Sequence, residues 1–217
     1  MTKERGILFS SEMVARLLSG EKTQTRRAVK VQPPDPARHY LDRYAKGPEW
    51  AYWVNPPDNR MVDGRTFPCP YGVPGDRLVC RETWGIANDG SDRTIYRADY
   101  LACPACNFHH EECTCSFRPP VDKWRPSIHL PRVRARIVLE ITDVRVERVQ
   151  SISEADAKAE GADSIFMASL ETFARGGALP PSTHRNGFGA LWRRINGVAS
   201  WESDPWCWCL TFKRVTP

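Results

Sequence analysis

Lys22 and Thr25 stand three positions apart in a short run that also carries Thr23, Arg26 and Arg27. A neutral lysine can take the proton of a neighbouring hydroxyl and turn that hydroxyl into a nucleophile. The same composition suits an exposed turn, because charge runs usually lie on the protein surface. The run therefore has two interpretations, a lysine–threonine pair at the mouth of a pocket and a solvated turn.

A short helix is expected to position this run. Over residues 11–19 the apolar residues from Met13 to Leu18 recur at helical spacing, after a short apolar strand at 6–9. Gly20 stands where a left-handed residue ends many helices. The chain should leave the helix at Gly20 and present the Lys22–Arg27 run directly afterwards.

A second polar pair falls inside an expected strand. Pro74-Gly75 suits the centre of a type II turn, and the strand that follows covers residues 77–84. Its residues Arg81 and Glu82 are either an exposed edge pair or the polar wall of a cleft, and the sequence favours neither.

Residues 132–141 give the clearest strand pattern, followed by a second strand at 144–149. Val133, Ala135, Ile137, Leu139 and Ile141 would share one face, which leaves an arginine stripe on the other. The stripe consists of Arg132, Arg134 and Arg136. Three cations on alternate residues suit a track for phosphates, and they equally suit a solvated face.

The last third of the chain predicts two helices and a strand. Ser153 and Asp156 have the spacing of a capping box, and the helix that they begin should end at Gly161. The apolar residues from Phe188 to Ile195 recur at helical spacing. The final strand contains Cys207 and Cys209, which we interpret as core thiols.

Composition limits the class of protein. The chain has 217 residues, a net charge of +5 and a pI near 8.8, which permits a polyanionic partner without requiring one. It contains no apolar run of membrane-spanning length and no signal-peptide pattern. We expect a cytoplasmic protein with no membrane partner; the oligomeric state is not predicted.

Four cysteines lie close together in the second of two irregular stretches. Cys103 and Cys106 form a Cys-x-x-Cys pair, and Cys113 and Cys115 follow shortly afterwards. This spacing predicts a structural zinc site, with His109 or His110 as a substitute ligand. Free surface thiols and a redox pair remain the alternatives, because the second pair is Cys-x-Cys where Cys-x-x-Cys is usual.

Taken together, these motifs resemble the ASCH domain, and in particular the longer ASCH proteins common in bacteriophages and prophages. The resemblance rests on Gly-x-Lys-Thr-x-Thr-x-Arg at 20–27, on Pro-Gly-Asp-Arg-Leu at 74–78, and on the helix ending Glu160-Gly161. It implies one α+β domain over residues 1–217 with a PUA-like fold, a mixed or antiparallel β-barrel closed by the first and last strands. The irregular stretches, at about 32–68 and about 88–123, would be insertions into this domain.

The resemblance also implies a reaction. Compact bacterial members of the family hydrolyse N(4)-acetylcytidine with a lysine, a threonine and a glutamate, which match Lys22, Thr25 and Glu160 in this sequence. We expect no cofactor to be required for catalysis. The predicted partner is a modified nucleoside or a single-stranded nucleic acid, and the cell is expected to be a bacterial host.

Other polar and aromatic residues are assigned to binding. The expected substrate contacts are Arg26, Arg81, Glu82, Trp84, Tyr96 and His129. The expected nucleic-acid contacts are Arg27, Arg132, Arg134 and Arg136. Two rival functions remain open, a non-catalytic RNA- or DNA-binding module, which would need the arginines and aromatic platforms alone, and a ribonuclease that uses the same cleft.

Overall fold

The computed structural model describes residues 2–30, 32, 39–43, 49–54, 66–102, 118–164 and 183–215. Of residues 39–43, 49–54 and 66–67 it describes the backbone alone. The chain divides into two compact units. Unit 1 comprises Met1–Gly20, Gly75–Glu140 and Lys213–Pro217, and unit 2 comprises Glu21–Pro74 and Ile141–Phe212. Each unit is described by itself.

Unit 1 combines β-strands, one α-helix and three short 3-10 helices within the described residues. Its elements are β1 (Glu4–Leu8), α1 (Ser11–Ser19), β6 (Arg77–Arg81), β7 (Trp84–Ile86), β8 (Thr94–Tyr96) and the short 3-10 helices η1 (Arg97–Tyr100), η2 (Ser127–His129) and η3 (Arg132–Arg134). β1 lies parallel to β6, and β6 pairs antiparallel with the start of β9 (Val138–Arg148), so that Leu78 lies opposite Leu139. β7 and β8 form a separate antiparallel pair.

The sequence signals for α1 are confirmed. The Ser10 hydroxyl accepts a hydrogen bond from the Met13 amide and caps the helix, as serine commonly does. Met13, Val14 and Leu17 are buried, and Gly20 ends the helix at φ +82°, a conformation that glycine adopts without steric cost.

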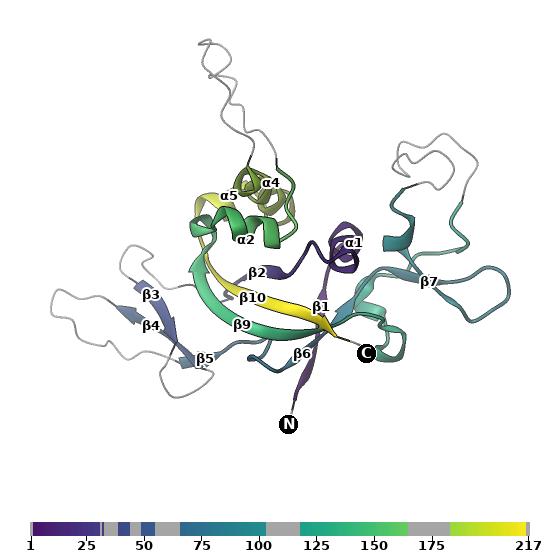
Figure 1. Cartoon of the computed structure of the whole chain (residues 1–217), viewed down its shortest axis with the longest axis horizontal. Coiled ribbons are helices and arrows are strands. Elements are labelled where there is room, and N and C mark those ends of the chain that lie inside the picture. The colour runs from purple at the N-terminus through teal and green to yellow at the C-terminus, as the bar shows by residue number, and fades with distance from the viewer. Residues whose placement is uncertain are drawn as a thin grey trace, which may run out of the picture. The chain divides into compact units, whose positions relative to one another are not determined.

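Unit 2 holds the remaining strands and most of the α-helical residues that the structure describes. Its elements are β2 (Gln24–Ala28), β3 (His39–Arg43), β4 (Glu49–Val54), β5 (Thr66–Pro68), most of β9, η4 (Val149–Ser151), α2 (Glu154–Ala159), α4 (His184–Asn196), α5 (Val198–Glu202) and most of β10 (Trp206–Val215). In Figure 1 the three α-helices gather over one side of β9 and β10. A buried cluster that includes Phe188, Trp192 and Cys207 fills the space between them.

The largest sheet has the strand order β1-β6-β9-β10-β2, in which β9 and β10 run through both units. The sheet is mixed, because β1–β6 is parallel and β10–β2 is antiparallel. With the α-helices, this makes the fold α+β, as the sequence predicted. The predicted barrel is not confirmed. Within the described part of the chain, the first and last strands, β1 and β10, do not pair with each other.

Three predictions of local structure need correction. Residues Arg132–Arg134 form the 3-10 turn η3, closed by a hydrogen bond from the Arg134 amide to the Pro131 carbonyl, so β9 begins only at Val138. β9 then continues to Arg148 as one strand where two were predicted. The expected loop at about 32–68 contains β3, β4 and β5, which pair as an antiparallel sheet.

Two smaller corrections concern side chains. Val133 is 90% exposed, although its neighbours Ala135, Ile137, Leu139 and Ile141 are buried as predicted. Ile195, predicted to face the core, is also mostly exposed. Within the described residues, no helix is long and apolar enough to cross a membrane.

Candidate functional site

Lys22 and Glu160 form a buried ion pair in unit 2. Lys22 Nζ donates a hydrogen bond to Glu160 Oε2 at 2.7 Å and another to the Glu160 backbone carbonyl at 2.6 Å. The two side chains are only 2% and 4% exposed. The fold thus brings together two residues that are 138 positions apart in the sequence.

Backbone hydrogen bonds hold both partners in place. The Thr23 amide donates to the Ala159 carbonyl at 2.8 Å, and the Thr23 carbonyl accepts from the Phe212 amide at 2.9 Å. The other partner follows α2, whose first turn is capped by the Ser153 hydroxyl. The ion pair is thus fixed between the end of α2 and the chain that leads into β2.

Arg26 extends the ion pair into a larger charged cluster. Its guanidinium is fully buried and donates to Glu147 Oε2 at 2.9 Å, to Asp156 Oδ2 at 3.2 Å and to the side-chain oxygen of Gln24. Its Nη1 also lies 3.8 Å from Glu160 Oε1. Burial lowers the pKa of Arg26, but the surrounding anionic groups outweigh burial and the net pKa lies above the ordinary value.

Arg145 closes the cluster on its solvent side. It contacts Glu147 at 2.9 Å and Asp156 at 3.4 Å, and it is 39% exposed. The lysine and two arginines thus face the carboxylates of Glu147, Asp156 and Glu160, and Arg145 also contacts Asp143 at 3.3 Å. Burial disfavours the charged form of Asp156, but the hydrogen bond from Gln24 and the nearby arginines outweigh it, so the pKa of Asp156 lies below its ordinary value.

Cys207 and Cys209 lie on the same face of β10 as this cluster. The Cys209 thiol is 3.7 Å from Glu147 Oε2, and both cysteines are free and buried. Burial raises the pKa of the Cys207 thiol to about 12 and raises that of Cys209 too, against the opposing effect of Arg26. The prediction that they are core thiols is confirmed.

Two polar atoms of the cluster have no hydrogen-bond partner within the described residues. They are Glu160 Oε1 and Arg26 Nε, both of which are buried. An unpaired buried acceptor costs roughly 1–3 kcal/mol, so it is the kind of group that a substrate donor would satisfy. Glu160 therefore binds Lys22 through one oxygen, while the other lies 3.8 Å from Arg26 Nη1 and accepts no hydrogen bond within the described residues.

Thr25 is not part of this arrangement. It lies opposite Leu210 in the β2–β10 pairing, one residue from Arg26, which lies opposite Cys209. Because side chains alternate along a strand, Thr25 projects from the face opposite to Gln24 and Arg26. The structure thus brings Lys22 and Glu160 together and turns the 2% exposed Thr25 to the other side of β2.

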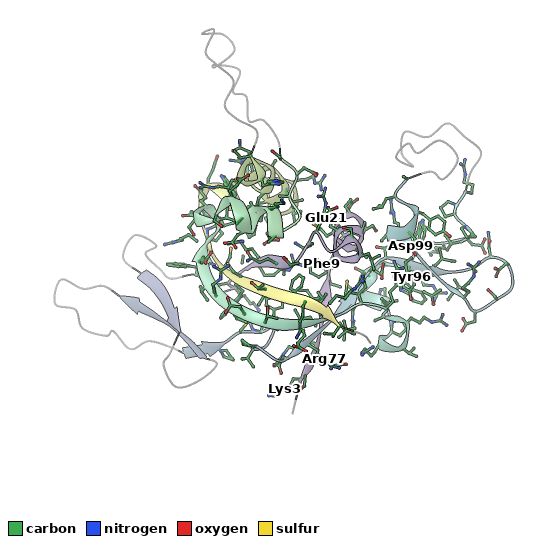
Figure 2. All side chains as sticks on the ribbon, viewed as in Figure 1. Lys3, Phe9, Glu21, Arg77, Tyr96 and Asp99 are labelled. Atoms are coloured by element: carbon green, nitrogen blue, oxygen red, sulfur yellow. The ribbon has the colours of Figure 1, made fainter. Side chains whose placement is uncertain are left out.

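Two of the predicted substrate contacts, Glu82 and Tyr96, belong to a second polar network in unit 1. Arg136 binds Glu82 through two hydrogen bonds of 2.9 and 3.0 Å and binds Asp99 in the same way at 2.9 and 2.7 Å. Its guanidinium stacks over the Tyr96 ring at 4.0 Å; Tyr96 and Asp99 are labelled in Figure 2. Glu82 is 1% exposed, so it is neither an exposed edge residue nor a cleft wall. Burial raises the pKa of Glu82 above its ordinary value despite the opposing charge of Arg136.

The remaining predicted contacts are more scattered. Arg81 donates to the Ile128 carbonyl at 2.9 Å. Trp84 is buried beneath the guanidinium groups of Arg125 and Arg134, and His129 is exposed. In unit 2, Arg27 is half-buried and lies near Tyr71. In the β2–β10 pairing it lies opposite Trp208.

The arginine stripe does not exist as predicted, because its residues precede β9. Each arginine is instead paired with an acid of unit 1. Arg132 binds Glu4 at 3.0 Å, and Arg134 binds both oxygens of Asp92 at 2.7 Å. Arg136 joins the Glu82 network described above. These pairs favour the solvated-face interpretation over a phosphate track.

Sequence reasoning missed Gln24, Arg145 and Glu147, and it read Asp156 only as a capping residue. Polar residues on alternate positions, Gln24 with Arg26 and Arg145 with Glu147, were the signal that could have revealed them. The predicted zinc ligands Cys103, Cys106, Cys113 and Cys115 lie outside the described residues, and the zinc site stays a prediction.

Comparisons with known proteins add little. The chain matches no protein-family model and no curated protein. It is similar to one solved structure, the protein EF3133 from Enterococcus faecalis, of the family DUF984, at 12% identity and a TM-score of 0.36. The match covers 100% of this chain and 82% of that one, and it is too weak to support an argument about fold or function.

Proposed function

We propose that the protein is an amide hydrolase acting on an N(4)-acylated cytidine-type nucleoside or base, within the PUA-like ASCH family. The observation that carries the proposal is the buried pair of Lys22 and Glu160, joined at 2.7 Å, with Glu160 Oε1 lacking a hydrogen-bond partner within the described residues. The substrate class comes from the resemblance of the motifs at 20–27 and 74–78.

The proposed chemistry begins with proton transfer within this pair. In the scheme that the resemblance implies, Lys22 gives a proton to Glu160, the neutral lysine takes the hydroxyl proton of Thr25, and Thr25 Oγ1 attacks the acyl carbon. The carbon–nitrogen bond then breaks as the leaving amine takes the proton from Lys22. Water hydrolyses the acyl-threonine, which releases the carboxylic acid and restores the hydroxyl.

Thr25 is the part of this scheme that the geometry supports least, because it lies on the opposite face of β2. Thr25→Ser keeps a hydroxyl, and Thr25→Val keeps the shape without it. The proposal expects deacylation to survive in part in Thr25→Ser and to vanish in folded Thr25→Val. Full activity in Thr25→Val would remove the threonine from the mechanism.

The substrate is tested by incubating the purified protein with N(4)-acylated cytidines and, separately, with labelled RNA. Release of the acyl group supports the hydrolase, and cleavage of the RNA supports the rival ribonuclease. Lys213→Met is the matched control, because Lys213 forms an exposed ion pair with Glu140 at 2.8 Å. Lys22→Met should abolish release, and Lys213→Met should leave it unchanged.

A further inference from the structure

Unit 1 contains a cavity that shares no residue with the Lys22–Glu160 cluster. Its volume is about 460 Å³, and it is lined by Trp84, Lys123, Trp124, Arg125, Pro126 and His129. Pockets that bind small molecules in proteins usually measure about 300–1,000 Å³. The size of this cavity therefore suits a ligand of the dimensions of a nucleotide.

Backbone hydrogen bonds fix the walls of the cavity. Trp84 and Arg125 exchange two hydrogen bonds, from the Trp84 amide to the Arg125 carbonyl at 3.2 Å and from the Arg125 amide to the Trp84 carbonyl at 2.7 Å. A second bridge joins Ala87 to Val121. The segment 121–125, which carries three of the lining residues, is thus paired at one end with Trp84 of β7 and at the other with Ala87, the residue after β7.

Gly85 permits this close packing. A Cβ atom at this position would lie 2.2 Å from Val121 Cγ2 and 2.9 Å from the Lys123 carbonyl oxygen. Only glycine lets β7 and the 121–125 segment approach so closely. The cavity is therefore built into the packing of unit 1.

The lining residues have a consistent chemistry. They include two indoles, two cations and an imidazole, and none of the six carries a negative charge. Trp84 is 4% exposed, with the Arg125 guanidinium 4.9 Å and the Arg134 guanidinium 5.7 Å from its ring. Trp124 is half-buried. Trp84 therefore serves as a covered wall, and Trp124 is the ring that remains for stacking.

One buried hydrogen-bond donor in the wall of the cavity has no acceptor within the described residues. The indole nitrogen of Trp84, Nε1, is buried and has no hydrogen-bond partner within the described residues. A buried N–H without an acceptor is unfavourable, and nucleobases carry carbonyl and ring-nitrogen acceptors beside a flat ring. Lys123 and Arg125 supply positive charge on the same cavity for a phosphate.

We propose that this cavity binds a nucleotide. The base stacks on Trp124, an acceptor on its edge takes the hydrogen bond of Trp84 Nε1, and the phosphate contacts Lys123 and Arg125. The ligand is either a free mononucleotide or one nucleotide of a single strand, since both present the same ring and phosphate. This proposal uses no residue of the Lys22–Glu160 cluster, so it stands or falls independently of the hydrolase.

The test is to titrate the full chain with cytidine monophosphate, cytidine, inorganic phosphate and a short single-stranded oligocytidylate, and to measure heat release. The monophosphate should bind, cytidine should bind several-fold more weakly, and phosphate alone should not bind measurably. Binding of the oligonucleotide without the mononucleotide would support the cavity and identify a single strand as the source. Binding of neither would overturn the proposal.

Variants separate the cavity from other surfaces. Trp124→Ala should weaken binding by about tenfold or more, as expected for the loss of one base stack. Trp84→Phe keeps a ring and removes the N–H, and it should weaken binding by about two- to tenfold. Lys123→Gln should weaken the binding of cytidine monophosphate and leave the binding of cytidine unchanged. The control is Arg93→Gln, at an exposed arginine of unit 1 that pairs with Asp89. Equal affinity of the wild type and Trp124→Ala, with both folded by circular dichroism, would overturn the proposal.

Discussion

At the scale of single residues, the charged cluster of unit 2 is a buried network whose members depend on one another. Lys22, Arg26 and Glu160 have almost no exposed surface, whereas Asp156, Glu147 and Arg145 reach the solvent. Removing one member of a buried pair leaves an uncompensated charge, and that is more costly than losing the pair altogether. The network can therefore be dissected by comparing single and double substitutions.

We expect Lys22→Met and Glu160→Gln each to lower the free energy of unfolding by about 3–5 kcal/mol. The double variant Lys22→Met/Glu160→Gln should recover much of that loss, because neither partner is left charged. Denaturant unfolding measures all three. For comparison, Lys213→Met at the exposed pair should cost at most about 1 kcal/mol. A double variant no more stable than its worse single parent would contradict a closed ion pair.

Asp156 should make the stability of the protein depend on pH. Its pKa in the folded protein lies below the ordinary value of 3.8, so it stabilises the fold above that pH and loses this contribution as the pH falls through the folded pKa. The difference in free energy of unfolding between the wild type and Asp156→Asn should be constant near neutral pH and shrink below about pH 3.8. Urea midpoints at a series of pH values would measure it, and a difference unaffected by acid would contradict the assignment.

At the scale of elements, α2 determines where Glu160 lies. The Ser153 hydroxyl accepts a hydrogen bond from the Asp156 amide at 3.0 Å, and Gly161 follows Glu160 at φ +76°. The helix is only six residues long, so its first-turn cap is a large share of its local stability.

Ser153→Ala should lower the free energy of unfolding by about 1 kcal/mol, and Ser153→Asp should preserve it, since aspartate caps helices equally well. Thermal or denaturant unfolding provides the measurement. The control is Ser151→Ala, at an exposed serine outside the helix whose hydroxyl bonds the Arg148 carbonyl. Equal losses at both serines would argue against a capping role.

The elements that the sequence predicted well are those with a local signal. Ser10 and Gly20 bracket α1, and Ser153 begins α2. The strand predicted from Arg132 failed because an alternating pattern of arginine and apolar residues also fits a 3-10 turn followed by extended chain. Pro131 precedes that turn, and the acids that bind its arginines, Glu4 and Asp92, are distant in sequence and leave no local signal.

Some residues of the site could likewise be predicted from the sequence, and others could not. Lys22 and Glu160 could be paired by motif, although nothing in their spacing requires contact. Gln24 and Glu147 join the cluster only because β2 and β9 present them toward α2, and that depends on strand register. Conversely, Thr25 was predicted beside Lys22 from sequence proximity, and the alternation of β2 separates it from Arg26.

At the scale of the whole molecule, the two units carry different chemistry. The ion-pair cluster lies within unit 2, and the aromatic and cationic cavity lies within unit 1. The hydrolase and nucleotide-binding proposals therefore make separable demands on the chain. The predicted zinc ligands add a third testable property.

Protein purified without added metal should contain one zinc per chain, because the spacing of Cys103, Cys106, Cys113 and Cys115 suits tetrahedral coordination. Elemental analysis would detect it, and Cys103→Ser with Cys106→Ser should remove it. Cys69→Ala, at a buried cysteine outside the predicted zinc ligands, should retain the metal. Wild-type protein without stoichiometric zinc would refute the site.

The central claim is that the Lys22–Glu160 pair performs chemistry. The most direct measurement compares acyl release from N(4)-acetylcytidine by the wild type and by the double variant Lys22→Met/Glu160→Gln, after unfolding curves have shown that both are folded. The account predicts turnover by the wild type and none by the folded double variant. No turnover by the wild type, or equal rates in the two proteins, would contradict it.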